Sequence, residues 1–209
     1  MRKKTLAIAL AVIAIVSVVT TGTLAWLSAQ TDPITNTFSP STIGLELEET
    51  TGADYKMVPG ATIAKNPTVT VTAGSEACYV FVQITENLGA WANVESHKAF
   101  SELLKYTVDS AWTALPNVSG VYYMLVAANE NADQEFHVLA DDEIVVSGVN
   151  VTKEYMDKLY KDNGDLVDNL PTLSFTAYAI QSANLPGTGA NDAATPAEAW
   201  ALASAQGNQ

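Results

Sequence analysis

Few residues of this chain have the types and spacing of a catalytic or metal-binding site. The two histidines, His97 and His137, stand in unrelated contexts, outside any HExxH or paired Cys/His spacing. The sequence has no glycine-rich phosphate loop and no GxSxG turn. We therefore predict no catalytic residues, no metal ligands and no cofactor. The alternative is an extracellular metallopeptidase, in which both histidines and a carboxylate would have to cluster.

Two acidic stretches raise the question of calcium. They are Asp141-Asp142-Glu143 and Asp162-Asn163-Gly164-Asp165, and neither has the spacing of an EF-hand loop. Turns also prefer Asp, Asn and Gly. We interpret both stretches as turns and keep calcium binding as a hypothesis.

Three further features have a structural and a functional interpretation. Cys78, the single cysteine, lies in an apolar run and is predicted to be a buried, inert thiol. Trp91 and Trp112 are interpreted as packing residues, with a surface module that binds a host or carbohydrate ligand as the alternative. Residues 185–189 spell the sortase motif LPxTG, but residues 190–209 contain neither an apolar span nor any Lys or Arg. We interpret them as a loop.

The first residues have the pattern of a secretory signal. Arg2, Lys3 and Lys4 precede an apolar run from Thr5 to Val19, and a small, polar region follows. Thr23 and Ala25 stand at minus three and minus one to a cut before Trp26. The sequence therefore predicts a signal helix over residues 1–25, removed by a signal peptidase, and a secreted, extracellular protein. A retained membrane anchor is the alternative.

The chain is strongly acidic. Its net charge is −13, and removal of residues 1–25 leaves seven basic against 23 acidic residues, a net charge of −16. This charge argues against binding to nucleic acid or to an anionic lipid surface. Membrane contact is expected only through the uncleaved signal. Any self-association should respond to pH and ions.

The elements that would position these residues are mostly strands. Val, Thr, Ile, Tyr and Phe alternate with polar residues in many short runs, which predicts an all-β, antiparallel β-sandwich. The expected strands are 43–48, 68–72, 78–85, 106–108, 121–127, 136–139, 143–149 and 173–181. Ala73-Gly74-Ser75 predicts a hairpin between the second and third of them.

A few short helices should decorate the sheets. They are expected over 94–105, after Thr152 as N-cap, and over 193–206. The predicted organisation is a signal peptide (1–25), an N-terminal arm with the first strand (26–42), a β-sandwich domain (43–185), and a C-terminal loop with an Ala-rich helix or tail (186–209).

The signal region and early mature region resemble a known family. Residues 22–27 and 35–38, then 58–60, 65–67 and 74–77, are similar to the TasA/camelysin proteins of Gram-positive bacteria, which carry a SipW-type signal peptide. The resemblance implies a jelly-roll-like sandwich that assembles into extracellular fibres of a biofilm matrix, with other matrix components as partners. Thr21 stands where many members have a glycine. The peptidase activity described for some members is not carried over, because no zinc-protease motif is present.

The N-terminal arm suggests a way to assemble. Once cut, it has apolar side chains but no obvious partner strand in the sequence. A free strand is a template for pairing with another chain. We hypothesise that the arm completes a sheet of a second copy, as a homopolymer, with Ile34 and Phe38 in pockets. The proposed contact residues are Ile34, Thr35, Asn36, Thr37 and Phe38.

Overall fold

The computed structural model describes residues 42–52, 55–95, 98–186 and 193–206. They belong to one compact unit, residues 40–209. The predicted signal helix, the cut at Thr23, Ala25 and Trp26, and the contact residues Ile34 to Phe38 lie outside the described residues. His97 also lies outside them.

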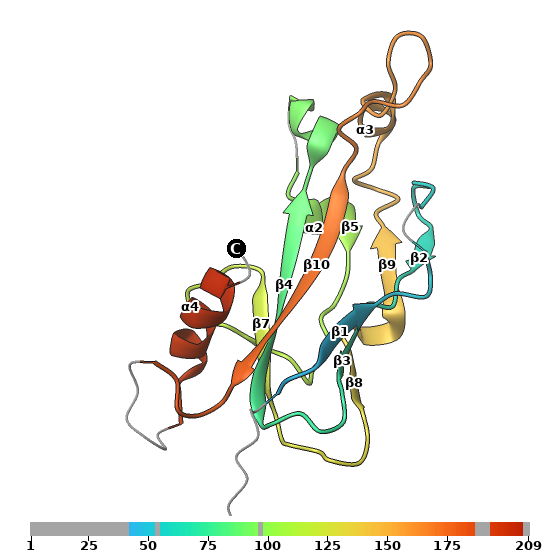
Figure 1. Ribbon diagram of the computed structural model, residues 1–209. Helices are drawn as coiled ribbons and strands as arrows, with labels where there is room; N and C mark the ends of the chain where they lie inside the picture. Colours follow the sequence, from blue (N-terminus) through green and yellow to red (C-terminus); the bar gives the residue numbers. More distant parts are fainter. Residues whose placement is uncertain (1–41, 53–54, 96–97, 187–192, 207–209) are drawn as a thin grey trace, which may run out of the picture. The chain divides into compact units, whose positions relative to one another are not determined.

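The described part of the chain is mostly β and forms three antiparallel sheets (Figure 1). One sheet has the order β1 (Leu45–Glu48), β3 (Thr68–Val71), β8 (Gln134–His137). The second has the order β10 (Thr172–Gln181), β4 (Cys78–Asn87), β7 (Val121–Val126), β6 (Thr113–Ala114). The third has the order β2 (Thr62–Ala64), β9 (Glu143–Val146), β5 (Leu104–Lys105).

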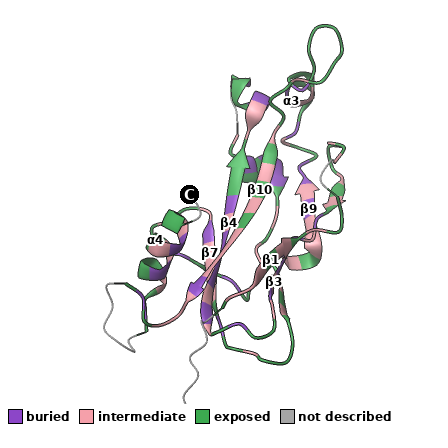
Figure 2. Cartoon of the chain, viewed as in Figure 1, coloured by how far each residue is buried: buried purple, intermediate pink, exposed green. Residues whose placement is uncertain are grey.

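Strand β4 organises the core because both of its faces are covered. Cys78, Val80 and Val82 point into the larger apolar cluster, which also takes side chains from the other two sheets. Phe81 points to the opposite face and belongs to a second cluster. Figure 2 shows buried residues along much of β4, whereas the neighbouring β10 is mostly intermediate or exposed. A strand that is apolar on both faces needs a covering layer on each side of its sheet, and β4 has one on each side. Both edges of β4 are also paired, with β10 and with β7.

The second cluster is closed by the C-terminal helix α4 (Pro196–Gln206). The indole ring of Trp200 packs against the rings of Phe81 and Tyr178, with centroids 5.3 and 5.1 Å away. Thr195 caps the helix: its hydroxyl accepts from the backbone N–H of Glu198, and the Glu198 carboxylate accepts from the backbone N–H of Thr195. This capping box fixes where the helix begins.

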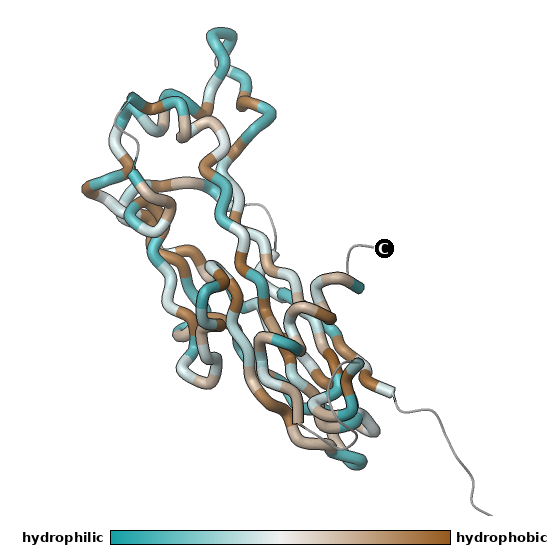
Figure 3. The backbone as a smooth tube through the Cα atoms, turned by 90° about the vertical axis from the view of Figure 1, so that its left-hand side faces the viewer, coloured by the Kyte–Doolittle hydropathy of each residue, from teal (hydrophilic) through white to brown (hydrophobic). Residues whose placement is uncertain are grey.

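The remaining helices are short. They are the 3₁₀ turns Gly89–Asn93 and Ala140–Asp142 and the α-helices α2 (Phe100–Leu103) and α3 (Lys153–Asp157). The loop between α3 and β10 is largely hydrophilic (Figure 3). Among the described residues, no helix is long and apolar enough to cross a membrane.

The predicted hairpin between residues 68–72 and 78–85 is wrong. Strands β3 and β4 lie in different sheets. The chain changes sheet at Gly74, where φ is +81°, and the backbone of Ser75 bridges to Asn129 instead of closing a hairpin. The pattern could not reveal this, because β4 needs partners on both sides and finds them in strands far away along the chain.

The predicted helix over 94–105 is also wrong in extent. Of the residues described in this range, only Phe100–Leu103 are α-helical, and Leu104 and Lys105 form β5. Ala99 is extended, which stops the helix from starting earlier. Three strands, β2, β5 and β6, were not expected, because each has only two or three residues, too few to show an alternation. The helix expected over 193–206 is present from Pro196.

Candidate functional site

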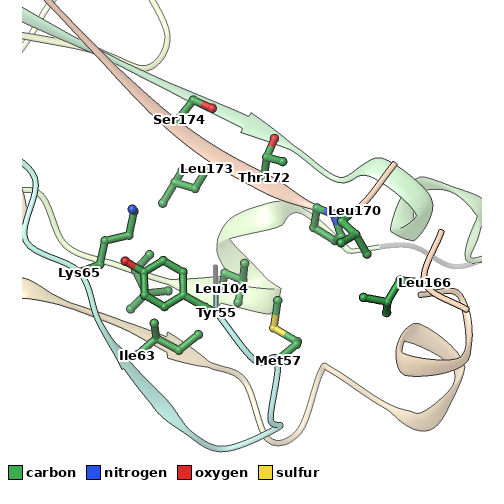
Figure 4. Close-up of a pocket in the computed structure, with 12 residues that line it drawn as sticks. Tyr55, Met57, Ile63, Lys65, Leu104, Leu166, Leu170, Thr172, Leu173 and Ser174 are labelled. Carbon is green, nitrogen blue, oxygen red and sulfur yellow. The ribbon is translucent and has the colours of Figure 1, made fainter. Parts of the chain in front are cut away.

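An apolar pocket of about 530 Å³ opens between β2 and the first half of β10 (Figure 4). Pockets of this size, lined mainly by apolar groups with a few polar ones, are typical of binding sites. We call it the edge pocket. Its lining residues are Tyr55, Met57, Ile63, Lys65, Leu104, Ile144, Leu166, Leu170, Pro171, Thr172, Leu173 and Ser174.

The edge pocket lies between two outermost strands. In the described part of the chain, β10 pairs over its ten residues with β4 alone, and β2 pairs with β9 alone. Leu104 and Ile144, from β5 and β9, are buried beneath the opening. The outer edges of both strands therefore flank an apolar surface, and an outermost strand presents unpaired backbone groups.

The first half of β10 is more accessible than the second. Thr172, Ser174 and Thr176 alternate with Leu173 and Phe175, and the alternating hydroxyl-bearing residues are exposed. Helix α4 packs near the second half of the strand, where Tyr178 and Ile180 join the second cluster. The half of β10 that borders the edge pocket consequently keeps an exposed face.

One wall of the edge pocket carries a buried cation. The Lys65 side chain is 8 % exposed, and its Nζ lies 2.5 Å from Glu49 Oε2. Its Nζ also lies 5.2 Å from the ring centroid of Tyr55 and 5.4 Å from that of Phe175. The hydroxyl of Tyr55 donates to the other oxygen of Glu49 at 2.6 Å. Lys65 thus positions a charge against two aromatic rings, at the end of β1.

This network shifts the acid–base behaviour of its members. Burial alone would raise the pKa of Glu49, but hydrogen bonds from Lys65, Tyr55 and Thr51 together with the charge of Lys65 hold that pKa below its ordinary value of 4.5. Burial and the hydrogen bond to Glu49 raise the pKa of Tyr55. Glu49 is therefore an anion at neutral pH and holds the lysine in place.

Comparison with known proteins finds no relative of this chain: no family model, no curated protein and no solved structure matches it.

The arrangement of β10 beside the edge pocket is suited to binding an extended peptide segment. Such a segment could hydrogen-bond to the edge of β10 while its apolar side chains entered the edge pocket.

Trp91 and Trp112 are both buried. Trp91 is fully buried and its indole N–H donates to the Tyr155 carbonyl at 3.0 Å. Trp112 is 6 % exposed and donates to the His137 carbonyl at 2.8 Å. The alternative of ligand binding through these two side chains is therefore wrong, and their interpretation as packing residues is confirmed.

His137 contacts a carboxylate five residues away in the sequence. Its Nδ1 lies 3.0 Å from Asp142 Oδ1, and the ring is half exposed. Within the described ranges, no three His, Cys, Asp or Glu side chains are placed to hold a metal ion. The residues Asp141 and Asp142 both have left-handed backbone, with φ of 61° and 51°, which Asp tolerates in tight turns.

The other acidic stretch also lies in a turn. The Asp165 N–H bonds to the Asn163 side chain at 3.1 Å, Gly164 has φ of +86°, and Tyr160 bridges to Leu166 on either side. The interpretation of both stretches as turns is confirmed. Calcium binding by these stretches stays a hypothesis.

Two other sequence features are now placed. Cys78 is fully buried, and burial raises the pKa of its thiol to about 11, as expected of an inert thiol. Leu185, the first residue of the LPxTG stretch, is 3 % exposed and packs in the second cluster. A transpeptidase would have to extract this side chain before it could recognise the motif.

The edge pocket was not anticipated from the sequence. Its lining comes from five separated segments, and β2 was too short to detect. The available signal was Lys65, a lone cation beside Ala64 and near Pro67, in a chain where basic residues are scarce. Which strands end at an edge is a property of the fold, and the periodicity of a strand does not reveal it.

Proposed function

We propose that this protein is a secreted, non-enzymatic structural component of the surface or biofilm matrix of a Gram-positive bacterium, and that it assembles into fibres by strand donation. In this proposal the three sheets form a jelly-roll-like β-sandwich, preceded by a signal helix that a signal peptidase removes before Trp26. Its main partner is a second copy of itself.

The observation that carries this proposal is the outer edge of β10, which among the described residues pairs with no strand other than β4. Ten residues is long for such an edge strand, since proteins usually blunt edges with short strands, charges or bulges. None of the residues Thr172–Gln181 is charged, and none is proline. An edge of this kind is suited to pair with an added strand.

The N-terminal arm (residues 26–42) supplies a suitable strand in sequence. The side chains of its proposed contact residues alternate in type. Ile34, Asn36 and Phe38 carry apolar or amide groups, and Thr35 and Thr37 between them carry hydroxyls. Addition of the arm of one copy to the edge of the next is a head-to-tail contact. Such contacts do not close on themselves and so generate filaments.

Electron microscopy of purified protein tests the proposal. Protein beginning at Trp26 is expected to form filaments, whereas protein beginning at Ser39 is not. A full-length arm carrying Ile34→Asp and Phe38→Asp keeps the chain length and should also fail, because charged side chains are costly to bury. Equal filament formation by all three proteins would rule out assembly through the arm.

A further inference from the structure

The edge pocket is polar at one end and apolar at the other. Figure 4 shows Lys65 and Tyr55 toward one end, and Leu166 and Leu170 toward the other. The side chains of Leu166 and Leu170 are exposed, at 52 % and 37 %, so the rim at the apolar end is accessible from solvent. A pocket divided in this way matches an amphipathic molecule, with its polar group at Lys65 and its apolar part toward the rim.

The polar end holds a cation that can accept a further partner. Lys65 is the one charged residue among the described residues that line the pocket, and its side chain is almost fully buried. Its ammonium group has three N–H donors, and its hydrogen bond within the described part of the chain goes to Glu49. The rings of Tyr55 and Phe175 attract the charge but lie 5.2 and 5.4 Å from Nζ at their centroids. An oxygen that enters the pocket can therefore accept a hydrogen bond from Lys65.

We propose that the edge pocket binds a fatty acid, with its carboxylate at the Lys65 ammonium and its hydrocarbon chain past Leu104 toward Leu166 and Leu170. This inference goes beyond the proposed function. It requires neither assembly of the protein nor any contact with the N-terminal arm.

The charge of Lys65 selects the head group. A cationic head group would be repelled by the ammonium at contact distance. A neutral head group would accept an ordinary hydrogen bond, whereas a carboxylate accepts a charge-assisted one, which is stronger. Glu49 is not one of the lining residues, so the ligand meets Lys65 and not its counter-charge. Glu49 nevertheless competes for the same ammonium, and its removal should strengthen binding of a carboxylate.

The volume of the pocket limits the length of the hydrocarbon chain. The pocket encloses about 530 Å³. Dodecanoate occupies roughly 400 Å³ if each heavy atom takes the volume of one molecule in liquid water, about 30 Å³. A chain of this length fills most of the pocket and buries its methylene groups against Leu104 and Ile144, which are buried beneath the opening.

Isothermal titration calorimetry of the full chain tests the head group. The titrants are dodecanoate and dodecyltrimethylammonium, which have the same hydrocarbon chain and opposite charge, each below its critical micelle concentration. Because the chain has a net charge of −13, non-specific adsorption would favour the cation. We expect one dodecanoate to bind per chain, at least about tenfold more tightly than the cation, because Lys65 attracts one head group and repels the other.

A pair of matched variants tests the location. Leu170→Glu places a carboxylate at the apolar end of the edge pocket, and Leu125→Glu places the same charge on β7, where Leu125 is 61 % exposed and outside the pocket lining. We expect dodecanoate to bind at least about tenfold more weakly to the first, since a charge beside a hydrocarbon chain is costly, and unchanged to the second. Circular dichroism verifies that both variants fold. Binding to the apolar run Thr5 to Val19 would be the same in both.

A further set of variants tests the contact with Lys65. Glu49→Gln keeps the lysine and removes its competitor, so dodecanoate should bind more tightly than to the unsubstituted chain. Glu48→Gln, an exposed carboxylate on β1, makes the same change in net charge and should have a smaller effect. The double variant Glu49→Gln/Lys65→Met removes both charges and should lose the preference for dodecanoate over the cation. Circular dichroism again verifies folding.

The outcomes distinguish this proposal from the proposed function. Tighter binding of the cation, or no saturable binding of dodecanoate, would overturn the fatty acid as occupant and leave an added peptide segment as the alternative. Equal binding by the two glutamate variants at Leu170 and Leu125 would overturn the edge pocket as the site. An equal effect of Glu49→Gln and Glu48→Gln would overturn Lys65 as the partner of the head group. Each of these results leaves filament formation untouched, and a failure to form filaments leaves the fatty-acid site standing.

Discussion

At the scale of single residues, the network around Lys65 contributes two residues, Lys65 and Tyr55, to the wall of the edge pocket. Lys65 is held by Glu49 and by two ring faces, and Glu49 is held in turn by Tyr55 and Thr51. A half-buried carboxylate with several donors is a strong acceptor. Loss of this carboxylate would leave the lysine buried without its counter-charge, which is the costlier side of such a pair.

The network predicts a pH dependence of stability. Because the folded-state pKa of Glu49 lies below its ordinary value of 4.5, the ion pair stabilises the fold above that pH, and the stabilisation is lost as the pH falls through the folded-state pKa. Glu49→Gln should lower the melting temperature at pH 7 but have progressively less effect below about pH 4.

The matched control is Glu48→Gln, a neighbouring exposed carboxylate on β1. Thermal unfolding from pH 3 to pH 8 compares the two variants with the unsubstituted chain. An effect of Glu49→Gln that stays the same at pH 3 as at pH 7, or an equal effect of Glu48→Gln, would contradict this role of Glu49.

At the scale of elements, helix α4 protects the face of the central sheet opposite the main cluster. Phe81, Tyr178 and Trp200 pack there, and the capping box at Thr195 fixes the first turn. Thr152, the threonine at the N-cap of α3, makes no side-chain hydrogen bond to its helix. The same residue type therefore stands at two helix starts with different roles.

This difference predicts two unequal substitutions. Thr195→Ala should lower the free energy of unfolding by about 1 kcal/mol, because an N–H at the start of α4 loses its acceptor. Thr152→Ala should change it by less than about 0.5 kcal/mol. Chemical denaturation of both variants measures the difference, and equal losses would show that the hydroxyl of Thr195 does not stabilise α4.

Much of the fold was predictable from the alternation of apolar and polar residues. The runs over 43–48, 121–127 and 173–181 all contain strands, and the last helix begins three residues after its expected start. The pairing of strands was not predictable, since the turn at Gly74 has the composition of a hairpin but carries the chain into another sheet. Strands of two or three residues, such as β6 and β2, have no period to detect.

The features of the candidate site also divide into those that the sequence could predict and those that it could not. The proposed arm stands out in the sequence because its apolar residues have no obvious partner strand there, whereas the edge pocket does not stand out. The edge pocket joins residues as distant in sequence as Tyr55 and Ser174, and it includes residues of β10 and β2, which are outermost strands of different sheets. Apolar residues such as Leu170 and Leu173 have the composition of ordinary core positions until their neighbours are known.

At the scale of the whole molecule, charge opposes assembly and apolar contact favours it. Without residues 1–25, as the proposal requires, the chain would have a net charge of −16, and the proposed contact involves mostly uncharged groups. Salt shortens the range of repulsion between copies, with a Debye length of about 10 Å at 0.1 M and about 3 Å at 1 M. Self-association through the arm is therefore expected to strengthen as salt is added.

Light scattering of protein beginning at Trp26, at ionic strengths from about 0.02 to about 0.5 M, measures this dependence. Protein beginning at Ser39 serves as the control for non-specific salting out. Filaments that dissolve as salt is added would indicate that ion pairs, and not strand addition, hold the copies together.

The measurement that most directly tests the central claim is amide hydrogen exchange in β10, compared between monomeric and assembled protein. Strand β4, which already has a partner on each side, is the internal reference and should exchange equally in both states. Strand addition predicts that exchange in residues 172–176 slows by at least about tenfold on assembly, because edge amides gain partners. Assembled protein whose β10 amides exchange as fast as those of the monomer would contradict the claim.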